Sequence, residues 1–301
     1  MVIIHLLLLL AMPPLLLGVI NRIKAWFAGR TGPPLLQPYY DLIRLLRKEM
    51  VVSSTTTWVF RVGPVVTLAA VMLAGLLVPL GRFDAPVGFT GDLVLFAYLF
   101  ALGRFFTTTA AMDTGSSFEG MGASREVTFA CFSEPALFLA FLVLAKLSGS
   151  LSLTPMLHAP LAIPIPGMPT AALALVAAGL FVVLLAENSR IPVDDPNTHL
   201  ELTMIHEVMV LDHSGPLLGA ILYGAAVKLF VLSAFVLHIL LPFQTGQAVA
   251  DWALFVAGML AIAAIVGVVE SVMARLQLRH VPTLLVAAFL LCGFGFLLTL
   301  T

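Results

Sequence analysis

Several ionisable side chains stand inside long apolar stretches of this sequence, where a charge calls for a partner or a task. Lys228 lies 12 residues after Pro216. On a helix this is about 18 Å, near the middle of a ~30 Å hydrocarbon layer. Arg104 lies at a similar depth in another apolar run, and Glu134 precedes Pro135, which can kink a helix and open its backbone to water. Each such charge costs on the order of 2.5–3.5 kcal/mol to insert into a membrane.

Two explanations fit these charges: they pair with opposite charges and fix helix packing, or they carry protons. Spacing along the chain offers two local pairs, Glu187 with Arg190 and Glu270 with Arg275. Glu134 and Lys228 have no such partner nearby in sequence. For them we favour a proton relay, because a group with a shifted pKa can accept and release protons as its surroundings change. The candidate proton path comprises Glu134, Glu187, Glu201, Glu207, Lys228 and Glu270.

Histidines and acids also gather between residues 188 and 215, so a metal site has to be considered. His199, His206 and His213 are seven residues apart, which on a helix is two turns and too far to share one ion. Cys131 and Cys292 cannot supply an iron–sulfur cluster, a zinc site or a disulfide framework. We therefore predict no metal site, no bound cofactor and no catalytic residue in this chain.

The elements that must hold these groups are membrane helices. Of 301 residues, 60% are hydrophobic and 10% are charged, against roughly 25% charged in a soluble domain. The net charge of −1 provides no field for nucleic acid. Apolar runs long enough to cross a bilayer lie near 2–20, 59–80, 92–111, 127–147, 170–187, 216–241, 251–273 and 281–300. We predict an all-α, polytopic membrane protein of about eight transmembrane helices, forming one domain over residues 1–301.

The distribution of basic residues predicts the orientation of these helices. The odd-numbered connections carry ten Lys and Arg residues, whereas the even-numbered ones carry only Arg82 and Lys146. By the positive-inside rule, the odd connections face the cytoplasm and both termini face outward. The first run lacks a basic region before it and cleavage-site residues after it, so we expect a retained helix rather than a signal peptide. The long cytoplasmic loops are then the place to look for docking.

The first cytoplasmic connection contains a short amphipathic helix, predicted over Tyr39 to Glu49. Its leucines share one face, and Asp41, Arg44 and Lys48 lie opposite. Such a helix is held by lipid headgroups or docks a soluble partner, and the pattern fits both equally.

The polar connections match a known pattern in order along the chain. The matching residues are Gly32-Pro33, Leu36-Gln37-Pro38, Asp41, Lys48-Glu49, Arg125 with Glu134, Ala186-Glu187-Asn188, Arg190, Pro192, Asp194 and Glu201-Leu202. Together they resemble the eight-helix core subunit of respiratory complex I, NADH dehydrogenase subunit 1. More closely they resemble its relatives in membrane-bound group 4 nickel–iron (NiFe) hydrogenases, of the formate hydrogenlyase subunit 4 type. The resemblance covers most of the chain.

Some residues favour the hydrogenase branch of this resemblance. They are Asp113-Thr114-Gly115-Ser116, Gly122-Ala123-Ser124-Arg125-Glu126, Lys228, and Glu270 with Ala274-Arg275. There are also departures, because Asn197-Thr198-His199 stands where the family has acids, and Met209-Val210 replaces an expected Glu-Tyr pair. These losses count against a quinone funnel lined as in complex I.

The resemblance implies a non-redox core subunit of a proton-translocating, hydrogenase-type complex in the cell inner (cytoplasmic) membrane. NiFe and Fe-S centres would lie on its partners: hydrogenase-like large and small subunits, a ferredoxin-like Fe-S subunit and antiporter-like membrane subunits. Candidate docking residues for the soluble arm are Gln37, Asp41, Arg44, Asp113, Arg125, Glu126, Arg190 and Asp194. The alternative is the quinone-site subunit of a complex I-like NADH:quinone oxidoreductase. A stand-alone secondary transporter would show an inverted internal repeat, which the sequence lacks.

Overall fold

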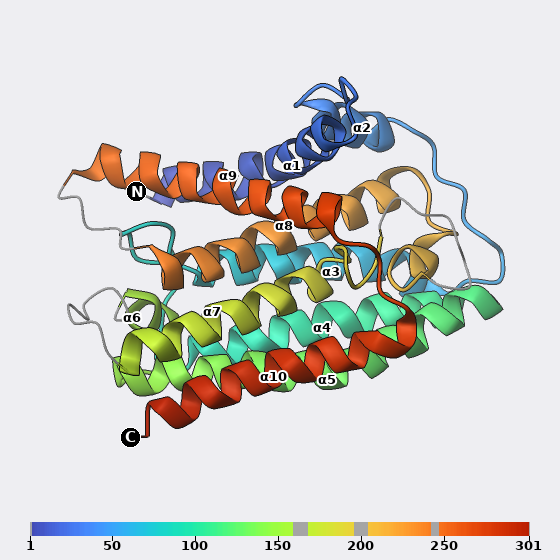
Figure 1. Ribbon diagram of the computed structural model, residues 1–301. Coiled ribbons are helices and arrows are strands. Elements are labelled where there is room, and N and C mark those ends of the chain that lie inside the picture. The colour runs from blue at the N-terminus through green and yellow to red at the C-terminus, as the bar shows by residue number, and fades with distance from the viewer. Residues whose placement is uncertain (1, 159–167, 196–203, 242–246, 301) are drawn as a thin grey trace.

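A computed structural model describes residues 2–158, 168–195, 204–241 and 247–300. The regular elements of these residues are helices (Figure 1). They are α1 (Val2–Phe27), α2 (Gln37–Leu46), α3 (Trp58–Leu77), α4 (Asp92–Asp113), α5 (Ser117–Ser148), α6 (Leu153–His158), α7 (Met168–Glu187), the 3-10 helix η2 (Glu207–Val210), α8 (Gly215–Leu240), α9 (Ala248–Val272), the 3-10 helix η3 (Leu278–His280) and α10 (Val281–Leu298).

Eight of the described helices are long and apolar enough to cross a membrane, which confirms the predicted number. The short α2 and α6 lie in connections between them. Figure 1 shows both termini at the same end of the bundle, as an even number of crossings requires. We call the opposite end, which carries the connecting residues 28–57, 114–116, 188–195, 204–214 and 273–280, the loop end. Which end faces the cytoplasm stays a prediction.

The predicted polar connection over 112–126 is wrong, because most of it is helix. Only Thr114 to Ser116 separate α4 from α5, and α5 begins ten residues before the expected 127. Its 32 residues would span about 48 Å, longer than a ~30 Å hydrocarbon core. The polar first turns of α5 can therefore be helical beyond the apolar layer. Gly122 serves close packing here, since a Cβ on it would lie 2.4 Å from Val208 Cγ1.

The helices pack in two connected groups. One contains α5, α7 and α10, and the other pairs α1 with α9 and α3 with α4. α8 contacts α1, α3 and α7, and it is the most buried of the spans. Its buried face joins an apolar core in which the rings of Phe96, Phe141 and Phe235 contact one another. α8 therefore holds a central position from which a charged side chain can reach several neighbours.

The predicted amphipathic helix in the first connection is α2, with bounds shifted to 37–46. It packs on α1 and α8. The side chains of Leu45 and Leu46 approach Gly219 of α8, and the Tyr39 hydroxyl donates a hydrogen bond to the Ala11 carbonyl of α1. Leu46 is nonetheless 61% exposed, so α2 also keeps an uncovered apolar edge.

Candidate functional site

Arg104 of α4 is the centre of the largest charged cluster in the described residues. Its guanidinium Nε lies 3.1 Å from Glu126 Oε1, and its Nη2 lies 2.6 Å from Glu187 Oε1. Nη1 pairs with Glu134. The carboxylates come from two helices, α5 and α7, which contact each other. Only 11% of the Arg104 side chain is exposed, so one buried cation is shared by three acids.

Lys228, from the middle of α8, completes the inner side of the cluster. Its Nζ lies 2.6 Å from Glu187 Oε2, while Ser133 Oγ donates a hydrogen bond of 2.7 Å to Glu187 Oε1. The ammonium also lies 5.9 Å from the centre of the Phe100 ring, within reach of a cation–π interaction. Glu187 therefore holds a buried negative charge between two cations, Arg104 and Lys228.

The outer side of the cluster passes through His206. Its Nε2 lies 3.0 Å from Glu126 Oε2, and its Nδ1 lies 3.8 Å from Asp194 Oδ2. Asp194 Oδ1 in turn accepts from Arg275 Nη2 at 2.8 Å. Burial acts to lower the pKa of His206, but Glu126 and Asp194 prevail and raise that pKa to about 9. His206 is therefore a cation at neutral pH.

Asp194 is held in its place from several directions. Its Oδ2 accepts hydrogen bonds from the backbone N–H groups of Ile205 and His206, at 3.1 and 3.2 Å. Although burial acts to raise the pKa of Asp194, His206 and Arg275 outweigh it and the pKa is lowered. The side chain is 1% exposed and stays ionised at neutral pH.

These contacts form one continuous chain of opposite charges: Lys228, Glu187, Arg104, Glu126, His206, Asp194 and Arg275, with Glu134 as a branch on Arg104. With His206 protonated, the cations Arg104, Lys228, Arg275 and His206 balance the acids Glu126, Glu134, Glu187 and Asp194. Buried charges are tolerated when they are paired in this way. The chain can therefore respond to a proton gained or lost at one member by redistributing its pairs.

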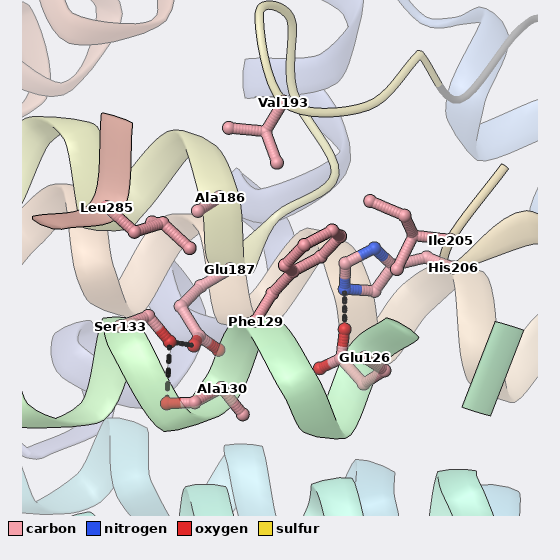
Figure 2. A pocket seen from close by; sticks show the side chains of 10 residues that line it. All are labelled: Glu126, Phe129, Ala130, Ser133, Ala186, Glu187, Val193, Ile205, His206 and Leu285. Atoms are coloured by element: carbon pink, nitrogen blue, oxygen red, sulfur yellow. Dashed lines mark hydrogen bonds and ion pairs between the residues drawn. The ribbon is translucent and has the colours of Figure 1, made fainter. Parts of the chain in front are cut away.

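A small cavity adjoins this chain of charges (Figure 2). Glu126, Ser133, Glu187 and His206 line its polar side, and apolar residues including Phe129 and Leu285 line the rest. About 10 Å³ is open to the centre of a water molecule, which is room for roughly one water. The cavity therefore suits a water that bridges charged groups rather than an organic ligand.

A second, smaller cluster joins three other segments. Glu270 of α9 lies 2.8 Å from Lys24 Nζ of α1 and 3.2 Å from Arg190 Nη1, in the turn after α7. The partners of Glu187 and Glu270 thus differ from the local pairs suggested by spacing. Glu187 pairs with Arg104 and Lys228 instead, and Glu270 with Lys24 and Arg190. Contacts between distant segments decide the pairing here.

Comparison with known proteins now bears on this arrangement. The model of a protein family described as NADH dehydrogenase matches residues 1–301. The chain belongs to this NADH dehydrogenase family. Within it, the chain is of the complex I subunit 1 type.

Two curated relatives of this NADH dehydrogenase family member come from Escherichia coli (strain K12). Formate hydrogenlyase subunit 4 is 32% identical over 301 residues, which cover 97% of this chain and 94% of that protein. Hydrogenase-4 component C is 34% identical over 239 residues, which cover 79% of this chain and 74% of that protein. Both names agree with the hydrogenase-type resemblance of the connections.

The fold is shared with a chain in the structure of the membrane-bound sulfane sulfur reductase, an archaeal respiratory membrane complex. The TM-score is 0.83 at 22% identity, over 99% of this chain and 97% of that one. The eight apolar helices among the described residues, with the family and its curated relatives, make this NADH dehydrogenase family member a multi-pass, complex I-like membrane subunit.

The residues predicted for a proton path fall into different places in this family member. Glu134, Glu187 and Lys228 are brought together around Arg104. Glu270 belongs to the second cluster, and Glu207 is half-buried at the start of η2. Glu201 lies outside the described residues. Their roles in proton transfer stay predictions.

The predicted docking residues divide by exposure. Arg44 is exposed on α2. On the same helix, Gln37 Nε2 donates a hydrogen bond of 2.9 Å to Asp41 Oδ1. Glu126, Arg190 and Asp194 are buried, and Asp113 accepts hydrogen bonds from the N–H and hydroxyl of Thr57, just before α3. Arg125 is half-buried and donates 2.8 Å to the Met204 carbonyl. The buried ones hold the loop end together rather than form its outer surface.

Sequence reasoning did not place two residues of the cluster. Arg104 was recognised as a charge at mid-membrane depth, but nothing in the sequence names acids 22, 30 and 83 positions away as its partners. His206 stands out in the sequence only as a member of the stretch rich in histidines and acids, which does not identify Glu126 as its partner. The signal that could have found it is chemical, because a histidine beside carboxylates gains a proton and becomes an ion-pair partner.

Proposed function

We propose that this chain is the non-redox core membrane subunit of a proton-translocating, hydrogenase-type complex. It would anchor a soluble arm carrying NiFe and Fe-S centres and link that arm to a proton path. The observation that supports this most is the unbroken chain of ion pairs from Arg275 and Asp194, at the loop end, to Lys228 in the middle of α8. Inserting so many charges into a membrane costs free energy, which a protein that only had to fold would avoid.

The proton path follows from the shared partners in this chain. Glu187 is bound by both Arg104 and Lys228, so a change at Glu126 or Glu134 alters the ion pair of Arg104 with Glu187 and then that of Glu187 with Lys228. A movement or charge change at the loop end is thereby passed to mid-membrane depth without any redox centre in this chain. Glu134, 43% exposed along its side chain, gives the cluster an opening to its surroundings.

The anchoring role rests on the surface of the loop end. Residues 21–58 contain six Lys or Arg residues but only two acids, Asp41 and Glu49. Of the basic residues, Arg44, Arg47 and Lys48 are exposed. We propose that this side faces the cytoplasm and receives the hydrogenase-like and ferredoxin-like partners, with antiporter-like subunits beside it in the inner membrane. Names of the relatives point to complexes of this kind.

The proton path is tested with the complete complex in sealed vesicles. Lys228→Ala and Glu134→Gln should leave subunit assembly and redox turnover in place, while proton movement per turnover falls roughly tenfold or more, as for the loss of at least about 1.4 kcal/mol of bias. Lys146→Ala is the matched control, because Lys146 lies in the last turn of α5, 12 residues beyond Glu134. Wild-type proton movement in both test variants would rule out this function for the cluster.

A further inference from the structure

We propose that His206 is a positioning residue, the charged bridge by which the segment 204–213 at the loop end controls the Arg104 cluster. The inference rests on the proposed function, since it says how a change at the docked face would reach the proton path. The His206 ring lies 3.0 Å from Glu126, on the membrane helix α5, and 3.8 Å from Asp194, in the turn after α7. Without it the chain of charges is broken at this point.

The segment that carries His206 is fastened to its surroundings near both ends by charged side chains. Arg125 Nη1 donates to the Met204 carbonyl at 2.8 Å, and Asp194 accepts the backbone N–H groups of residues 205 and 206. At the other end, Glu119 Oε1 accepts from the Asp212 N–H at 3.0 Å. The side chains that make these hydrogen bonds come from α5 and from the turn after α7. A partner that shifts either element therefore also shifts the imidazole of His206.

Between these hydrogen bonds the segment packs closely against α5. The Ile205 carbonyl, Val208 and Met209 all approach Gly122, where a Cβ would lie within 2.4–2.9 Å of them. Packing this tight has few intermediate positions. The segment is therefore either seated, with His206 between its two carboxylates, or displaced as a unit.

The consequence of displacement follows from the charges that surround His206. These are Glu126 from α5, Asp194 from the turn after α7, and beyond them Arg104 from α4 and Arg275 after α9. When the imidazolium leaves, Glu126 depends on Arg104 alone or takes up a proton. Arg104 is then shared differently with Glu187, and Glu187 differently with Lys228. The bridge thus sets the charge distribution of the whole cluster without touching Lys228.

The bridge requires a positive charge, which gives it a characteristic pH dependence. The pKa of His206, raised to about 9 by its two carboxylates, exceeds its ordinary value of 6.5. The link is therefore complete below pH 6.5, largely intact at neutral pH, and lost as the pH rises through about 9. A lysine at this position, with an ordinary pKa near ~10.4, would move the upper limit to higher pH.

The experiment measures protons moved per redox turnover by the complete complex in sealed vesicles, from pH 6 to pH 10. His206→Gln should reduce this ratio roughly tenfold from pH 6 to pH 8, a small part of what a broken buried ion pair can cost, and should match the wild type at pH 10, where the neutral His206 no longer bridges. His206→Lys should restore the ratio and extend it above the wild-type limit near pH 9. His280→Gln serves as the control, because His280 is an exposed histidine at the same end, in η3.

The outcomes separate this inference from the proposed function. If His206→Gln keeps the wild-type ratio and pH profile while Lys228→Ala loses proton movement, the bridge is wrong and the proton path stands. If Lys228→Ala also keeps full proton movement, the proposed function itself fails. Should His206→Gln not assemble, His206→Lys decides: assembly with a ratio that extends above the wild-type pH limit supports the bridge, and assembly without proton movement overturns it.

Discussion

At the scale of single residues, Arg104 determines how the acids of this protein are used. Three carboxylates converge on one guanidinium with 11% of its side chain exposed. Arginine suits this position because its planar fork has five donors and does not lose its proton in proteins. Arg104 therefore stays positively charged while the ion pairs among Glu126, Glu134, Glu187 and Lys228 rearrange.

Replacing Arg104 should destabilise the protein more than replacing any single acid of the cluster. In Arg104→Gln the carboxylates of Glu126 and Glu187 lose their common cation inside the bundle, and breaking a buried ion pair costs roughly 3–5 kcal/mol. We expect a clear drop in the midpoint of thermal unfolding of the purified protein. Arg61→Gln, at an exposed position of α3, should change stability by no more than ~0.5 kcal/mol. Equal midpoints for the two variants would contradict the central role of Arg104.

Sequence alone located the charges but could not pair them. A lysine or arginine in an apolar run is recognisable by its cost, which is how Lys228 and Arg104 stood out. Their partners lie 41 and up to 83 positions away, and helical spacing relates only residues three or four apart. The pairs suggested by local spacing for Glu187 and Glu270 were accordingly replaced by partners on other helices.

At the scale of elements, the position of the cluster depends on where α7 ends. Glu187 is its last residue, yet it meets Lys228 from the middle of α8. The turn that follows is buried inside the bundle, with Arg190 and Asp194 each at most 9% exposed. Irregular backbone at this depth is tolerated where protein surrounds it and satisfies its polar groups. The end of α7 and the buried turn after it thus place Glu187 against the middle of α8.

The early start of α5 shows why polar connections are hard to predict. Ser117 to Glu126 contain two glycines and several polar residues, a composition typical of a loop. The helix forms because Gly122 lets the segment 204–210 lie against it, and because Glu119 and Arg125 bind that segment. Both reasons are tertiary contacts, which periodicity within one segment does not reveal.

The two glycines of α5 offer a matched pair of substitutions. Gly122→Ala should displace the segment 204–210, because the added Cβ would lie 2.4 Å from Val208 Cγ1 and 2.9 Å from the Ile205 carbonyl oxygen. Gly120→Ala meets no atom within 4 Å and should stabilise the helix by about 0.5–1 kcal/mol. Hydrogen–deuterium exchange followed by mass spectrometry should show faster exchange over 204–213 in the first variant only. Unchanged exchange in Gly122→Ala would mean that residues 204–210 do not pack closely against α5 at Gly122.

At the scale of the whole molecule, the apolar runs determine the architecture with little ambiguity. Eight runs were predicted and eight described helices can cross a membrane, with ends that differ by a few residues except at α5 and at the end of α1. Hydropathy succeeds here because a membrane helix must satisfy its own backbone over about 20 apolar residues. The order of packing, with α8 in the centre, was not predictable from the runs themselves.

At the same scale, the buried charges of this protein link several of its helices and connections. The cluster joins segments from α4, α5, α7 and α8 with the two connections that follow α7 and α9. A complex I-like membrane subunit of this kind works with partners, as its relatives in multisubunit complexes do.

The central claim, that this chain is the core membrane subunit of a hydrogenase-type complex, is tested most directly by purifying the native complex in mild detergent and identifying its subunits by mass spectrometry. We predict that a large soluble subunit co-migrates with this chain and carries paired C-x-x-C motifs able to bind nickel and iron, together with a ferredoxin-like subunit and antiporter-like membrane subunits. Purification of the chain alone, or with NADH-oxidising subunits and no such large subunit, would contradict the claim.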